Sequence, residues 1–179
     1  IAEAGVNHNG RLDLALKLVD AAARAGADAV KFQTFRAENV ATQHAKMAAY
    51  QKKNLGKTES QLAMIKKLEL PERFYPKIIE HCKKRNIIFL STPHGGTQSI
   101  DLLSSLKVPA FKIGSGDLTN MPLLQYAARL KKPIIISTGM ATMKEIKEAI
   151  SWIRKAGNNQ IIALACTTNY PTPLNQVNL

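Results

Sequence analysis

The chain has 179 residues, of which 45% are apolar and 21% charged, a balance that suits one folded domain with a sizeable core and disfavours disorder. Its formal net charge of +12 favours acidic partners, among them nucleic acids, anionic membranes and phosphorylated or carboxylated metabolites. The lysines are spread out and mostly fall near predicted helix ends or in loops, which favours a solvated surface over a nucleic-acid patch.

The two cysteines are too few for a disulfide framework and do not match zinc-site spacing. No apolar run approaches the roughly 20 residues of a membrane helix, and the chain does not open on a signal-peptide pattern. We therefore expect a reduced, cytoplasmic protein that contacts no membrane. Because the sequence starts at Ile1 inside a strand-like run, we expect that both ends have been trimmed.

Strand-like apolar runs alternate with helical patterns along the chain. The predicted strands are 1–5, 28–34, 87–91, 108–113, 133–139 and 161–166. Such runs, apolar on both faces and separated by helices, indicate a parallel sheet. Between 35 and 57 no clean period is visible, and a long excursion of this kind is typical of a lid or binding loop.

Local signals predict where helices begin and end. Asn9 and Asn120 are placed to cap the helices that follow them, and Gly26 stands where a C-terminal cap belongs. Capping boxes are expected at 58–61 and at 142–145.

Two architectures suit this alternation, a (β/α)₈ TIM barrel and an open doubly wound sheet. A dinucleotide-binding sheet carries G-x-G-x-x-G after its first strand, and Gly5 and Gly10 do not match that spacing. We therefore expect an α/β protein of the TIM-barrel class, truncated after about six β–α units, with 1–179 as a partial catalytic domain.

The run 110–117 reads as a buried strand that ends in an anion-binding turn. Gly114 and Gly116 would free the backbone to adopt positive φ and point successive N–H groups into one concavity. Ser115 adds a hydroxyl and Lys112 a positive charge. A phosphate or carboxylate would suit this turn.

Polar residues also follow the other predicted strands, and chemistry collects at the C-terminal strand ends of parallel sheets. These residues are Glu3, Lys31, Gln33, Ser91, Thr92, Lys112, Ser115, Ser137, Thr138, Cys166, Thr167 and Thr168. Core packing does not explain why so many polar residues occur at these positions, because each polar group needs a hydrogen-bond partner once it is buried. We predict a site for a phosphorylated or carboxylated small molecule, in which Glu3 is either a general base or only the ion-pair partner of Lys31.

Histidines give weaker signals. His8 and His94 follow strand ends and are candidates for contact with substrate or metal, whereas His81 reads as a surface or packing residue. Cys166 reads as an inert thiol, and Tyr170 either lines the site or packs against nearby prolines.

Six motifs, at 1–10, 30–34, 89–93, 111–116, 137–140 and 166–171, together resemble the sialic acid synthase (N-acetylneuraminate synthase) family. The resemblance covers essentially the whole chain. It implies a TIM barrel that condenses phosphoenolpyruvate with an N-acetylated hexosamine, typically N-acetylmannosamine, and releases phosphate. It also implies a divalent metal (Mn²⁺ or Mg²⁺), a C-terminal antifreeze-like domain beyond 179 and a domain-swapped homodimer.

The resemblance also assigns roles to individual residues. Those expected to bind phosphoenolpyruvate are Lys31, Lys112, Ser115, Ser137 and Thr168. Glu3 is expected to be the carboxylate near the reacting sugar aldehyde and water. Gln33 and Tyr170 are expected to contact the sugar. Two lysines would neutralise a substrate that carries both phosphate and carboxylate.

Some positions depart from the family pattern. His94 stands where an aromatic or apolar residue is usual, Ala165 where histidine is common, and Asp117 where glutamate is frequent. The metal-binding histidines of the family would lie beyond residue 179, so no metal ligand is assigned here. Legionaminic, pseudaminic and 9-phosphorylated sialic acids stay open as products.

Two rival functions stay open on the residues alone. A Schiff-base aldolase would use Lys31 or Lys112 as its nucleophile. A basic nucleic-acid-binding module would need clustered cations with exposed aromatic residues, and only 6% of the residues are aromatic.

Overall fold

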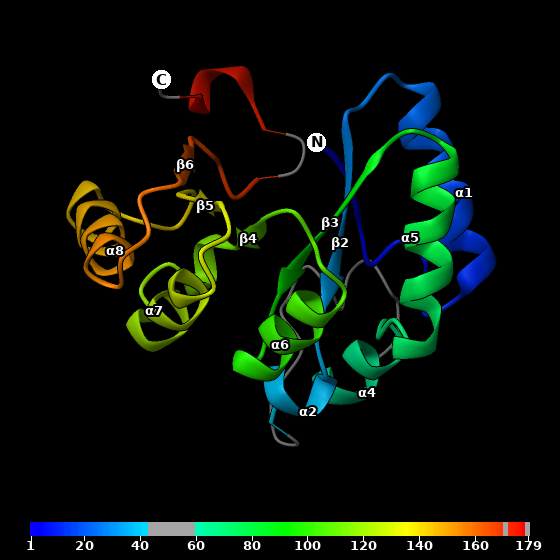
Figure 1. Cartoon of the computed structure of the whole chain (residues 1–179), viewed down its shortest axis with the longest axis horizontal. Helices are drawn as coiled ribbons and strands as arrows, with labels where there is room; N and C mark the ends of the chain where they lie inside the picture. The colour runs from blue at the N-terminus through cyan, green and yellow to red at the C-terminus, as the bar shows by residue number, and fades with distance from the viewer. Residues whose placement is uncertain (43–59, 170–171, 178–179) are drawn as a thin grey trace. The chain divides into compact units, whose positions relative to one another are not determined.

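The computed structural model describes residues 1–42, 60–169 and 172–177 (Figure 1). The chain divides into two compact units, Ile1–Phe89 and Leu90–Leu179. The strands form two sheets of three, in the orders β1-β2-β3 and β4-β5-β6.

The first unit alternates strands and helices as predicted. Its elements are β1 (Ala2–Gly5), α1 (Leu12–Arg24), β2 (Ala29–Thr34), α2 (Ala37–Val40), α4 (Gln61–Lys66), the 3₁₀ turn η1 (Glu72–Phe74), α5 (Tyr75–Lys84) and the start of β3 (Ile88–Pro93). Strands β1 and β2 are parallel. Figure 1 shows α1 and α5 side by side, and the apolar positions of α1 that face inward, Ala15, Val19 and Ala22, are buried.

The start of α1 differs from the prediction. Arg11 is its N-cap residue and makes no side-chain capping bond, so the expected capping by Asn9 is wrong. Asn9 instead adopts a φ of 49° in the loop before the helix. Next to it, Gly10 has a φ of 70°, and a Cβ there would lie 2.9 Å from the Lys67 carbonyl oxygen. This loop therefore runs against the backbone that follows α4.

The end of α1 is as expected. Gly26, with a φ of 74°, follows the helix, and its N–H donates to the Ala23 carbonyl at 3.0 Å. A glycine takes this left-handed conformation without the steric cost of a Cβ, so it ends the helix cheaply.

Helix α4 begins later than the predicted capping box. Ser60 is its N-cap residue and its hydroxyl accepts from the Ala63 N–H, so a box starting at Thr58 is wrong for this helix. Residues 43–59, which hold most of the predicted excursion, lie outside the described residues.

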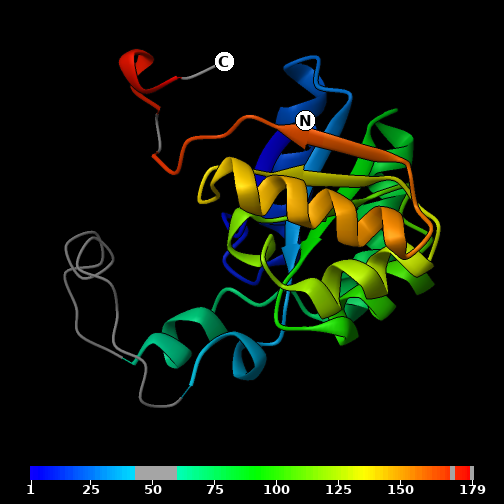
Figure 2. The same cartoon turned by 90° about the vertical axis from the view of Figure 1, so that its left-hand side faces the viewer.

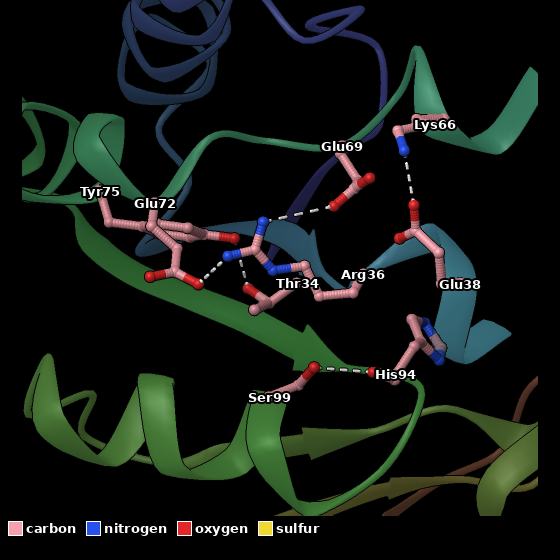
Figure 3. A network of polar contacts seen from close by, with 9 residues as sticks. All are labelled: Thr34, Arg36, Glu38, Lys66, Glu69, Glu72, Tyr75, His94 and Ser99. Carbon is pink, nitrogen blue, oxygen red and sulfur yellow. Dashed lines mark hydrogen bonds and ion pairs between the residues drawn. The ribbon is translucent and has the colours of Figure 1, made fainter. Parts of the chain in front are cut away.

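A polar network ties α2, α4 and the turn η1 together (Figure 3). Arg36 bonds Glu72 at 2.5 Å, and Lys66 bonds Glu38 at 2.6 Å. At the end of β2, the hydroxyls of Thr34 and Tyr75 lie 2.9 Å apart. These contacts fasten the segments on both sides of residues 43–59 to the end of β2.

The second unit continues the alternation. Its elements after β3 are α6 (Thr97–Ser105), β4 (Phe111–Ile113), the 3₁₀ turn η2 (Ser115–Asp117), α7 (Met121–Arg129), β5 (Ile134–Ser137), α8 (Met143–Lys155), β6 (Ile161–Leu164) and the 3₁₀ turn η3 (Leu174–Gln176). Strands β4, β5 and β6 are parallel. Figure 2 shows α7 and α8 running alongside each other.

Both predicted caps of the second unit are confirmed. The Asn120 side chain accepts from the Leu123 N–H at the start of α7. Thr142 and Glu145 form the full reciprocal capping box of α8. These signals depend on residues three positions apart, so they can be read without knowledge of the tertiary fold.

The predicted burial on both faces is found for β4 and β5 but not for β6. Strands β4 and β5 are almost wholly buried, with Phe111, Ile113, Ile134 and Ile136 at 0% exposure. In β6, by contrast, Ile162 is 51% exposed. The fold is thus α/β with parallel sheets, as predicted, and closure into an eight-stranded barrel stays a prediction.

Candidate functional site

Glu3 on β1 and Lys31 on β2 lie next to each other within their strands. They are direct partners in the parallel register, so both side chains leave the same face of the sheet. Their charged groups lie 2.5 Å apart, with the Lys31 side chain 9% and the Glu3 side chain 52% exposed. The expected ion pair is present, and it is compatible with both readings of Glu3, because about half of the Glu3 side chain is still exposed.

Gly5 lets Gln33 join this group. The register shifts between Glu3 and Gly5, and Gly5 has a φ of 52°. A Cβ at this position would lie 3.4 Å from Glu3 Oε1 and 3.9 Å from Gln33 Nε2. Two predicted site residues of the first unit, Glu3 and Gln33, therefore lie beside Gly5, and Glu3 also pairs with Lys31.

Lys112 and Ser137 meet in the second unit. Lys112 lies on β4 and is 6% exposed, and Ser137 ends the neighbouring strand β5. The Lys112 ammonium donates to the Ser137 hydroxyl and to the Ile113 carbonyl at 3.1 Å. Burying an ammonium costs solvation free energy unless its N–H groups donate hydrogen bonds. The two hydrogen bonds to the strand ends therefore both stabilise this charge and fix its orientation.

The turn after β4 carries Ser115 but has a different backbone from the one predicted. Gly114 has a φ of −70° and Gly116 is not among the residues with positive φ, so the positive-φ expectation is wrong. The segment is a 3₁₀ turn in which the Asp117 N–H donates to the Gly114 carbonyl at 3.1 Å. Ser115, half-buried, begins that turn.

His94 explains why position 114 is a glycine. A Cβ on Gly114 would lie 3.2 Å from His94 Cε1, closer than most Cβ contacts. The same imidazole reaches Asp117, with 3.0 Å between Nδ1 and Oδ2. Sequence reasoning noted His94 and Asp117 as separate departures and missed that they are partners; the position of His94 after a strand end was the available signal.

His8 is buried and neutral. Burial lowers the pKa of its imidazole to about 4. Its Nδ1 accepts from the Gly10 N–H at 3.0 Å, so the proton of the neutral ring is on Nε2. Among the described residues, Nε2 is the one buried side-chain polar atom that has no hydrogen-bond partner.

The remaining predicted residues are less constrained. Thr168 is exposed in the segment after β6, as is Cys166. Tyr170 lies outside the described residues.

In the part of the chain that is described, no group of three or more His, Cys, Asp or Glu side chains could hold a metal ion. The expected Mn²⁺ or Mg²⁺ therefore stays a prediction about residues elsewhere. No described helix is both long and apolar enough to cross a membrane.

The structure thus defines an α/β protein with two polar pairs on neighbouring parallel strands. In the first unit a carboxylate meets a buried lysine, and in the second unit a buried lysine meets a serine hydroxyl. The model of the NeuB family matches residues 18–179, and the chain belongs to this family. This confirms the family resemblance drawn from the motifs.

Several relatives are named as synthases of legionaminic, pseudaminic or sialic acids or their phosphates. The chain is 52% identical over 181 residues to the N,N'-diacetyllegionaminic acid synthase of Campylobacter jejuni, covering all of this chain and 54% of that protein. It is 36% identical over 173 residues to the N-acetylneuraminate-9-phosphate synthase of Drosophila melanogaster, covering 96% of this chain and 46% of that protein. The chain spans about half the length of the curated relatives it matches.

Two solved structures of similar proteins have the same fold over nearly the whole of this chain. The N-acetylneuraminic acid synthetase of Leptospira borgpetersenii, crystallised with citrate, superposes with a TM-score of 0.82 at 32% identity, over 99% of this chain and 56% of that one. The Bacillus subtilis spore coat protein SpsE gives a TM-score of 0.76 at 41% identity, over 96% and 44% of the two chains.

Proposed function

We propose that the complete protein containing this chain condenses phosphoenolpyruvate with an N-acetylated hexosamine, N-acetylmannosamine or a relative, to form a nonulosonic acid and release phosphate. The observation that carries the proposal is the buried Lys112 ammonium held against Ser137 at the ends of β4 and β5. Membership of the NeuB family and the names of the relatives support it.

The residues of the second unit suit the anionic donor. Phosphoenolpyruvate carries a phosphate and a carboxylate, and the Lys112 ammonium with the hydroxyls of Ser115 and Ser137 would bind its oxygens through charge-assisted hydrogen bonds. Thr168 follows the next strand and would add a further hydroxyl. An ammonium that is already desolvated and oriented binds an anion without first losing its own water.

The residues of the first unit suit the reacting sugar. Lys31 would contact the donor, and the open side of the Glu3 carboxylate would hold or accept a proton beside the aldehyde or the attacking water. Gln33 and Tyr170 would contact the sugar. In the reaction, C3 of phosphoenolpyruvate bonds to the aldehyde carbon, water adds at C2 and phosphate leaves. A divalent metal, when bound, would polarise the aldehyde.

The partners, assembly and location follow from the same proposal. We expect small-molecule substrates and no nucleic acid, a homodimer through a further C-terminal domain, and a cytoplasmic location.

The test is phosphate release by the complete protein. With phosphoenolpyruvate, Mn²⁺ and N-acetylmannosamine or 2,4-diacetamido analogues, we expect phosphate release that depends on the sugar and stops with EDTA. Borohydride trapping of a keto acid on Lys31 or Lys112, with no phosphate released, would instead establish the Schiff-base aldolase.

A further inference from the structure

His94 lies beside one end of the turn that presents Ser115 and bonds the other end. At Gly114 its ring leaves little room for a side chain, since an added Cβ would be 3.2 Å from Cε1. Its Nδ1 lies 3.0 Å from Asp117 Oδ2. Because a carboxylate only accepts hydrogen bonds, Nδ1 carries the proton and donates. One imidazole therefore bonds Asp117, after Ser115 and Gly116, and limits the space at Gly114, before them.

His94 is itself well anchored. Its carbonyl accepts from the Ser99 hydroxyl at 2.7 Å, a contact drawn in Figure 3, and Ser99 is buried in α6. Gly95 and Gly96, with φ values of 76° and 110°, turn the chain between His94 and that helix. The His94 and Asp117 side chains are only 29% and 23% exposed. An anchored donor transmits its own fixed position to the group that it binds.

We propose that His94 is a positioning residue that holds the Ser115 hydroxyl in place for an anionic substrate, acting through Asp117. This inference rests on the proposed function, in which Ser115 contacts phosphoenolpyruvate. The hydrogen bond joins the segment just after β3 to the turn after β4, so it ties that turn to a second part of the chain. A hydroxyl confined in this way loses less rotational and backbone freedom when it binds.

Two substitutions separate the hydrogen bond from ring packing. His94→Phe keeps a ring beside Gly114 and removes the donor, whereas His94→Asn keeps an N–H donor near the position of Nδ1. In the complete protein, calorimetry should give about tenfold weaker phosphoenolpyruvate binding for His94→Phe and a change below about threefold for His94→Asn. His81→Ala is the matched control, because His81 also bonds an aspartate, Asp20 at 2.8 Å, but lies within α5.

A double-mutant cycle then tests whether His94 acts through Ser115. In a Ser115→Ala background, His94→Phe should weaken binding by less than about twofold, and in a Ser137→Ala background the full tenfold effect should persist. An equal effect in both backgrounds would overturn the inference, as would wild-type affinity in His94→Phe. If the wild-type protein itself binds no phosphoenolpyruvate, the proposed function fails instead, so the two failures are distinguishable.

Discussion

Glu3 and Lys31 are register partners on parallel strands, and their charged groups are 2.5 Å apart. The pair is unequal, because the ammonium is nearly buried and the carboxylate is half exposed. The lysine is therefore paired with a side chain that is itself still half exposed. Because the two side chains differ in exposure, we expect a change of Glu3 and a change of Lys31 to have different effects on the protein.

Replacing Glu3 tests its role beyond the ion pair. Glu3→Gln should lower kcat of the complete protein by at least about 100-fold, the usual range for a positioned acid or base, while phosphoenolpyruvate still binds. Steady-state phosphate release and calorimetry measure the two quantities. Glu80→Gln is the control, because Glu80 pairs with Lys84 on the exposed face of α5; equal losses in the two variants would remove Glu3 from the chemistry.

Replacing Lys112 tests the anion site. Lys112→Ala should abolish phosphoenolpyruvate binding without unfolding the complete protein, because the charge that pairs with the substrate is removed along with its desolvation cost. Calorimetry and a thermal melt check both parts. Lys132→Ala is the control, since Lys132 also donates to a carbonyl, that of Val108 at 2.6 Å. Unchanged affinity in Lys112→Ala would rule out this assignment.

The buried His8 makes stability depend on pH. Its pKa is about 4 in the folded protein and about 6.5 when unfolded, so below pH 6.5 the unfolded state binds a proton that the folded state does not. Stability is therefore complete above about pH 6.5 and falls as the pH drops towards 4, by up to about 3 kcal/mol.

Urea unfolding at pH 7 and pH 4.5 measures this loss. His8→Gln removes the titrating group, and the part of the acid destabilisation that is due to His8 should vanish in that variant. An identical pH dependence in the two proteins would contradict the burial argument.

The two glycines of the turn after β4 should respond differently to alanine. At Gly114 the new Cβ meets His94 Cε1 at 3.2 Å, whereas at Gly116 nothing lies within 4 Å. Gly114→Ala should destabilise the protein by about 1 kcal/mol and weaken phosphoenolpyruvate binding, and Gly116→Ala should change neither by much. Denaturant titration with binding isotherms for both variants makes the comparison; the reverse order of effects would show that the close approach of His94 is not maintained in solution.

The sequence predicted what depends on near neighbours in the chain. The Thr142 and Glu145 box and the Asn120 cap were readable because their partners lie three residues away. Strand positions were readable because apolar runs are interrupted by glycine and polar residues. Capping by Asn9 failed because several polar residues precede α1 and local spacing does not choose among them.

Long-range partners were not readable. His94 and Asp117 are 23 positions apart, and only the adjacency of β3 and β4 loops in the folded unit brings them together. The same contact changed the explanation for Gly114, from a need for positive φ to a need for space. In contrast, the pairing of Glu3 with Lys31 was one of the two readings that the sequence offered for Glu3, because both residues lie on consecutive predicted strands of a parallel sheet.

Gly10 has no room for a side chain, since a Cβ there would lie 2.9 Å from one carbonyl oxygen and 3.2 Å from the next, those of Lys67 and Glu69. Both obstacles are backbone carbonyl oxygens, which are present whatever side chains stand at positions 67 and 69. In a saturation library, position 10 should therefore tolerate glycine alone, and second-site suppressors should be confined to changes that shift the path of the backbone around 67–69.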